Sequence, residues 1–159
     1  AQIGFTDNSL MTFQANTKLF INEYVYKPKA KASVGKYILN LIEGGFRTIT
    51  GMIAKKAPDD YAINTPVATI GVRGTDYRAY YHNGRLGVGW YKGTPCVTTL
   101  KDGKTICLSK DLQYVEVPDA NSAAVPLKQR PDYFDQDLVI DVVNINGFDI
   151  GMEGNVITK

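Results

Sequence analysis

The chain has 159 residues, of which 44% are hydrophobic and 21% charged, and its formal net charge is +2. This length suffices for one domain with a buried core. The small charge is unlike the strongly basic faces that bind nucleic acid, and no apolar run approaches the roughly 20 residues of a membrane span. We therefore expect a globular domain that neither binds nucleic acid nor inserts into a membrane.

Strand-like sequence dominates the first 117 residues. The runs are short, mostly alternate apolar and polar residues, and are rich in β-branched and aromatic side chains. They are "SLMTFQ", "TKLFINEYVY", "KYILNLIEG", "YAINT", "VATIGV", "DYRAYY", "RLGVGWY", "CVTTL", "KTICLS" and "LQYVEV". Short strands separated by turns at about 8–12 residues indicate an all-β fold. We expect a twisted antiparallel sandwich or β-roll of about ten short strands.

Two segments depart from this pattern. "KPKAKASVGK" carries Lys27, Lys29, Lys31 and Lys36 with little apolar content, which predicts a solvated hairpin loop or, as the alternative, a contact with an anionic surface. "TGMIAKKAPDD" has the only helical character in the chain. Thr50 can cap a turn or two there and Pro58 should end it, so we expect at most one or two short helical turns near 50–57.

The stretch "TPVATIGVRGTDY", residues 65–77, places Arg73 between Gly71 and Gly74. It lies between strands and lacks the lysine and spacing of a phosphate-binding loop. Glycine inside a strand marks a bulge or a close backbone approach, and an arginine there can tie two strands together through its five donors. We expect Arg73 to be buried or half-buried, bonded to carbonyls or to an acid from another strand, with Arg47 in "GGFRTITG" in a similar role. The alternative is an exposed contact for an anion or a protein partner.

Cys96 and Cys107 flank "VTTLKDGKTI", which predicts a hairpin around Asp102-Gly103. A four-residue turn from Leu100 to Gly103 places the cysteines directly opposite each other, and a two-residue turn leaves them one diagonal step apart on the same face. A three-residue turn with a bulge sends them to different faces. We expect a disulfide in an oxidising compartment, with two buried thiols as the alternative.

Few residues suggest chemistry. His82 is the single histidine and lies beside a turn, and Asp149 and Glu153 offer too few oxygens for a calcium site. The ten tyrosines are typical of half-buried sheet faces, and Tyr80, Tyr81 and Trp90 are the candidates for ligand contacts. We therefore expect no catalytic residues, no metal and no cofactor.

The last 41 residues differ from the rest. "PDANSAAVPLKQRPD", residues 118–132, has small residues, three prolines and no periodicity, which is typical of a linker. We expect one domain over 1–118, followed by a linker and extension over 119–159 that crosses the surface and carries a strand at 138–145.

Residues 1–117 resemble the FecR domain, the domain of the ferric-citrate regulator of Gram-negative bacteria. The resemblance rests on "LIEGGFRTITG", "YAINTPVATIGVRGTDY" and "GRLGVGWYKG", with weaker similarity in "FTDNSLMTFQANTKLFINEY" and "TICLSKDLQYVEV". Asn8 stands where the family has glycine, and Lys110-Asp111-Leu112 replace another usual glycine. The matching motif positions are Gly45, Phe46, Arg47, Thr65, Pro66, Gly71, Arg73, Gly74 and Thr75.

The resemblance implies a non-enzymatic, extracytoplasmic domain that starts after the family's first strands and lies in the bacterial periplasm or at the cell surface. It also implies a binding or signal-relay function exerted on an envelope protein through exposed sheet edges or loops. The alternative is a cell-surface domain that binds a small molecule or a glycan through exposed tyrosines and Trp90.

Overall fold

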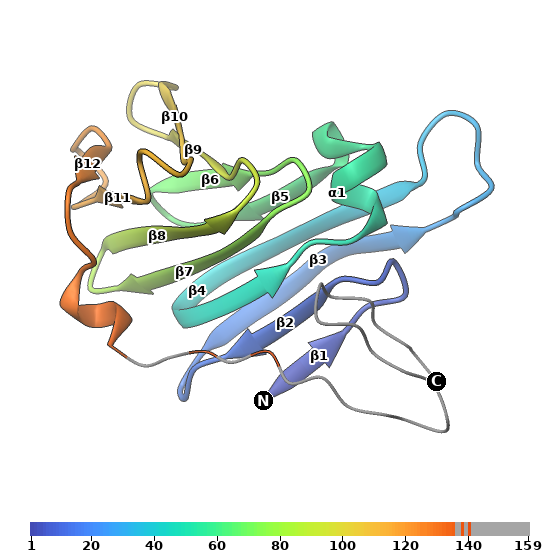
Figure 1. The fold of residues 1–159 in the computed structure, drawn as a ribbon, viewed down its shortest axis with the longest axis horizontal. Helices are drawn as coiled ribbons and strands as arrows, with labels where there is room; N and C mark the ends of the chain where they lie inside the picture. Colours follow the sequence, from blue (N-terminus) through green and yellow to red (C-terminus); the bar gives the residue numbers. More distant parts are fainter. Residues whose placement is uncertain (136–137, 139, 141–159) are drawn as a thin grey trace.

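The computed structural model describes residues 1–135, 138 and 140, and its elements confirm the expected all-β fold (Figure 1). The strands are β1 (Gln2–Gly4), β2 (Leu10–Phe13), β3 (Lys18–Tyr26), β4 (Gly35–Ile49), β5 (Tyr61–Asn64), β6 (Ala68–Gly71), β7 (Asp76–His82), β8 (Arg85–Lys92), β9 (Cys96–Thr99), β10 (Thr105–Cys107), β11 (Tyr114–Val117) and β12 (Val125–Leu127). The helical turns are α1 (Met52–Lys56), η1 (Pro58–Asp60) and η2 (Asp132–Phe134). The helical prediction near 50–57 is therefore confirmed.

The long strand β4 joins two layers of one curled sheet (Figure 1). Its first part pairs with β3 and β5, and its second part pairs with β2 and β7. The path through the sheet runs β10-β9-β6-β5-β4-β7-β8-β11-β12. Every pair among the described strands is antiparallel except β4–β5, which is parallel. A parallel pair needs a crossover connection, and the segment containing α1 and η1 supplies it.

The core lies between the two layers. Tyr37, Leu39 and Leu41 alternate along β4 and have no exposed surface, while the residues between them point the other way. Ile53 of α1 joins the same cluster, so the short helix closes the core at the crossover. The alternation of apolar and polar residues in the sequence of β4 therefore matches the alternation of buried and more exposed side chains along the strand.

The cap of α1 differs from the prediction. Gly51, not Thr50, occupies the N-cap position, and it has no side chain to cap with. The buried Asp7 supplies the missing acceptors, since its carbonyl oxygen accepts from Met52 N–H at 2.8 Å and its carboxylate from Ile53 N–H at 3.3 Å. Asp7 comes from the β1–β2 connection, so a distant segment performs the task that local sequence assigned to Thr50.

The segment after β11 is part of the packed structure as far as it is described. β12 pairs with β11, and η2 then lies over the outer face of β8, the face opposite the core. A Cβ at Gly87 would lie 2.4 Å from the Tyr133 ring, so glycine is required there for the ring to pack. The strand expected at 138–145 falls largely outside the described residues, and Asp149 and Glu153 fall outside them entirely.

Candidate partner-binding edge

Arg73 is exposed, so the prediction of a buried or half-buried arginine is wrong. β6 ends at Gly71, and Arg73 lies in the four-residue connection to β7. Its guanidinium stays in contact with water there, so the free-energy cost of burying the charge is avoided. A Cβ at Gly71 would meet nothing within 4 Å, so the close backbone approach expected there is absent, whereas Gly74 has a positive φ of +53°, which favours glycine. The alternative interpretation of Arg73 as an exposed contact residue is the one that the geometry permits.

Arg47 makes the contacts that were expected of Arg73. Its Nε and Nη2 donate to the two carboxylate oxygens of Asp76 at 3.0 and 2.8 Å, which joins β4 to β7. Its Nη1 donates to the Leu138 carbonyl at 3.1 Å, and its guanidinium lies 4.1 Å from the centroid of the Tyr91 ring. A bidentate pair of this kind fixes the relative position of the two strands.

Arg78, which sequence reasoning missed, is the buried arginine of the fold. It is 2% exposed, lies 4.3 Å from the centroid of the Phe134 ring, and donates to the Phe134 carbonyl at 3.2 Å. The feature that could have indicated its burial is its position opposite Gly89 in the β7–β8 hairpin. The missing side chain of Gly89 leaves room for the arginine and for Phe134. Arg78 therefore fastens η2 to the sheet.

The remaining motif positions shape the backbone. Phe46 is fully buried in the core, and Gly45 lies against the Ala79 carbonyl and the Gln14 side chain. The Thr65 hydroxyl donates to the Ala68 carbonyl at 2.8 Å and accepts from its N–H at 3.0 Å, which holds the turn before β6. Pro66 is exposed and Thr75 is buried.

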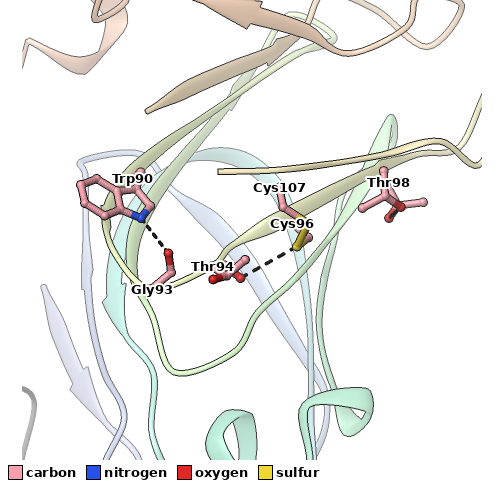
Figure 2. Close-up of a disulfide and its surroundings, with 7 residues drawn as sticks. Trp90, Gly93, Thr94, Cys96, Thr98 and Cys107 are labelled. Carbon is pink, nitrogen blue, oxygen red and sulfur yellow. Dashed lines mark hydrogen bonds between the residues drawn. A yellow bond between two sulfur atoms is a disulfide. The ribbon is translucent and has the colours of Figure 1, made fainter. Parts of the chain in front are cut away.

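The predicted disulfide is confirmed, and of the three turn lengths considered for the hairpin the four-residue turn is the one present. Cys96 pairs directly with Cys107 across β9 and β10, and their sulfur atoms are bonded (Figure 2). Thr99 N–H donates to the Lys104 carbonyl at 3.1 Å, so the turn comprises residues 100–103. The bridge therefore ties together the two strands at one end of the sheet.

Reduction of this disulfide should lower the free energy of unfolding by about 3 kcal/mol, because the open chain regains the entropy of a short closed loop. The Cys96→Ser/Cys107→Ser double variant should show the same loss in urea denaturation, with an unchanged native circular dichroism spectrum. Equal denaturation midpoints of the oxidised, reduced and double-variant proteins would contradict this expectation.

The three aromatic candidates do not form one surface. Tyr81 and Trp90 pack against the core, and Trp90 Nε1 donates to the Gly93 carbonyl at 2.7 Å (Figure 2). Tyr80 lies on the outer face, where its ring stacks on Tyr133 with centroids 5.4 Å apart.

His82 is exposed at its turn, as expected, and its Nδ1 lies 2.5 Å from a Glu43 carboxylate oxygen.

No group of three or more histidine, cysteine, aspartate or glutamate side chains is placed to hold a metal ion within the described part of the chain. The same residues contain no helix that is long and apolar enough to cross a bilayer.

The most exposed apolar surface on a strand lies along β3, the edge strand of its layer. Among the described strands β3 pairs only with β4, so its other side offers unpaired backbone groups. Phe20 is 61% exposed, Ile21 53% and Val25 39%. A long edge strand with large exposed apolar side chains is the form of surface that accepts an added strand. We name residues 18–26 the β3 edge.

A cavity of about 570 Å³ lies beside the start of this edge. Ala1, Ile3, Phe13, Leu19 and Ile21 are among its lining residues, and most of its surface is apolar.

Lysines surround the β3 edge. Lys18 begins the strand, and Lys27, Lys29 and Lys31 lie exposed in the hairpin loop that follows it, as the sequence predicted. None of the four forms an ion pair with a carboxylate of the described residues. The single acid on the strand, Glu23, lies 3.7 Å from Lys36 of β4. The electrostatic character of this edge is therefore positive.

A family model described as FecR protein matches residues 1–94. Two crystal structures of a candidate anti-sigma factor from Parabacteroides distasonis ATCC 8503 have a similar fold, with TM-scores of 0.57 and 0.56 and 16% sequence identity. Each match covers 79% of this chain and 53% of the solved chain, so this chain spans about half the length of that protein. No curated protein matches the chain. The structural likeness at this identity shows the fold alone.

Proposed function

Because the chain belongs to the FecR protein family, we propose that it is a non-catalytic signal-relay module that acts outside the cytoplasm by binding another protein at the β3 edge. The name of the structurally similar protein, a candidate anti-sigma factor, supports a regulatory role. The disulfide supports an oxidising compartment such as the periplasm. The partner is then an envelope protein.

The open edge of β3 is the observation that carries this proposal. Backbone pairing supplies affinity without catalytic residues, and the side chains of alternate residues supply specificity. Phe20 and Ile21 are both largely exposed and offer apolar contacts to an added strand. Lys18, Lys27, Lys29 and Lys31, which pair with no carboxylate in the part of the chain that the structure describes, favour acidic residues in that strand. The partner segment is therefore an extended strand that carries both apolar and acidic residues.

The test compares capture of envelope proteins by three immobilised forms of the domain. The Phe20→Glu/Ile21→Glu variant removes apolar contacts at the β3 edge and adds charges that repel an acidic strand. Leu100→Glu is the matched control, because Leu100 is also 61% exposed but lies in the β9–β10 turn. All three should have similar melting temperatures, since the replaced side chains are exposed.

One envelope protein should be retained by the wild-type domain and by Leu100→Glu, and be lost from the Phe20→Glu/Ile21→Glu variant. Changing Lys27, Lys29 and Lys31 to glutamate should slow its association and weaken the salt dependence of binding. Equal retention by the β3-edge variant and the control would refute the proposed binding surface.

A further inference from the structure

A second cavity lies at the closed end of the β7–β8 hairpin, away from the β3 edge. Its volume is about 240 Å³, and it is lined by Tyr80, His82, Asn83, Arg85 and Tyr133. Pockets for drug-sized ligands are usually about 300–1,000 Å³, so this one has room for a single ring-sized molecule.

Strand register explains why these side chains meet. His82 and Arg85 form the last pair of the hairpin, and Tyr80 lies opposite Gly87 one repeat further along the same face. Glycine at position 87 leaves space that the Tyr133 ring fills from η2. The cavity is thus bounded by a hairpin end on one side and by the C-terminal segment on the other.

Aromatic rings form one wall of the cavity. The Tyr80 and Tyr133 rings are stacked with an interplanar angle of 18°, and the His82 ring lies 6.0 Å from the Tyr80 centroid. The Tyr133 ring is held in place because its hydroxyl donates to Glu116 Oε2 at 2.7 Å. Burial and this carboxylate both raise the pKa of the Tyr133 phenol.

The polar groups around the rings are both donors and acceptors. Arg85 Nε lies 3.8 Å from the second Glu116 oxygen, which is too long for a hydrogen bond, and the arginine side chain is 55% exposed. Its guanidinium N–H groups are therefore directed at least in part toward solvent. Asn83, which lines the cavity, carries an amide that both donates and accepts, whereas Glu43 lies beside His82 and is not a lining residue.

Rings beside a mixed set of donors and acceptors suit a molecule with an apolar ring face and several hydroxyl groups. A sugar ring has this composition, because its C–H groups pack on aromatic surfaces while its hydroxyls both donate and accept. An anionic ligand is disfavoured because the carboxylates of Glu43 and Glu116 lie beside the lining residues His82 and Arg85. We propose that this cavity binds one neutral sugar ring of an envelope glycan. This site is independent of the β3 edge.

Amide chemical shifts can test this site with defined probes, namely the methyl glycosides of glucose, galactose and N-acetylglucosamine. At least one should bind with a dissociation constant on the order of 1 mM and shift the amides of Tyr80, His82, Asn83 and Arg85. Arg85→Ala should weaken that binding about tenfold, which corresponds to the loss of roughly 1.4 kcal/mol. Arg73→Ala removes an equally charged, exposed side chain from another loop and should leave binding unchanged.

Three results would overturn the assignment. They are the absence of shifts at these amides with all three glycosides, equal binding by wild type and Arg85→Ala, and tighter binding of glucuronate than of methyl glucoside. Amide shifts of Arg85→Ala that match those of the wild type away from the hairpin show that the variant is folded. Loss of partner capture at the β3 edge has no bearing on any of these results.

Discussion

Replacing Arg78 with alanine should lower the free energy of unfolding by about 3–5 kcal/mol. The change removes a buried guanidinium, opens a void beside Gly89, and takes from the Phe134 carbonyl the donor at 3.2 Å, leaving it the hydrogen bond from Arg130 Nη2. It also removes the cation–π contact with the Phe134 ring. The Arg78→Lys variant should regain only part of the loss, because an ammonium lacks the planar fork of donors.

Urea denaturation of Arg78→Ala and Arg73→Ala provides the matched comparison. Both variants lose one arginine, but Arg73 is exposed in a loop, and its replacement should change stability by no more than about 0.5 kcal/mol. Similar denaturation midpoints for the two variants would show that the buried arginine does not hold the C-terminal segment to the sheet.

Raising the pH above 10 should destabilise the fold steeply, because three tyrosines are buried in the core. Tyr61 and Tyr77 share a hydrogen bond of 2.9 Å between their hydroxyls, and Tyr37 stacks on Tyr61 with centroids 4.7 Å apart. Burial raises the pKa of all three phenols above the usual value of 10.0. Below pH 10 each phenol is neutral in both the folded and the unfolded chain, so the contribution of the buried phenols to the free energy of unfolding is fully present.

Above pH 10 the unfolded chain loses these protons while the folded core retains them, so stability falls until the pH reaches the raised values of the folded state. Each tyrosine lowers the free energy of unfolding by about 1.4 kcal/mol per pH unit, or about 4 kcal/mol per pH unit for the three together. The slope is measured from urea midpoints at several pH values. Tyr61→Phe should reduce the part of the slope that comes from these three core phenols by about one third, while Tyr133, whose pKa is also raised, adds its own contribution. A stability that stays constant from pH 9 to pH 11 would contradict burial of these phenols.

Local features of the fold were predictable because their causes lie within a few residues. The β9–β10 hairpin shows this, since Asp102-Gly103 and the two flanking strands restrict the turn to a few lengths, one of which places Cys96 opposite Cys107. The short helix at 52–56 is similar, because Pro58 limits its length. Alternation along β4 predicted its buried face for the same reason.

Contacts between distant segments were not predictable from local sequence. The Phe134 carbonyl that Arg78 reaches is 56 residues away, and nothing near Arg78 indicates it. The expected burial of Arg73 rested on the glycines beside it, which indicate a close backbone approach, but a Cβ at Gly71 would meet nothing within 4 Å. The capping of α1 by Asp7 was also not predictable from local sequence, because the N–H groups that Asp7 accepts from lie more than 40 residues further along the chain.

The candidate binding edge depends on strand order, which alternation does not reveal. The sequence predicts a strand at 17–26, but β3 is an edge strand because, among the described strands, it pairs with β4 alone. Edge position and the exposure of Phe20 and Ile21 therefore follow from topology.

Hydrogen exchange of the β3 backbone amides, with and without the captured envelope partner, tests the proposed binding surface most directly. A strand added at the β3 edge would bond the outward N–H groups of alternate residues within Lys18–Tyr26, since the others already face β4. We expect exchange at those outward amides to slow in the complex and to return to its free rate with Phe20→Glu/Ile21→Glu. Unchanged exchange along β3 in a saturated complex, with new protection elsewhere, would show that the partner binds another surface.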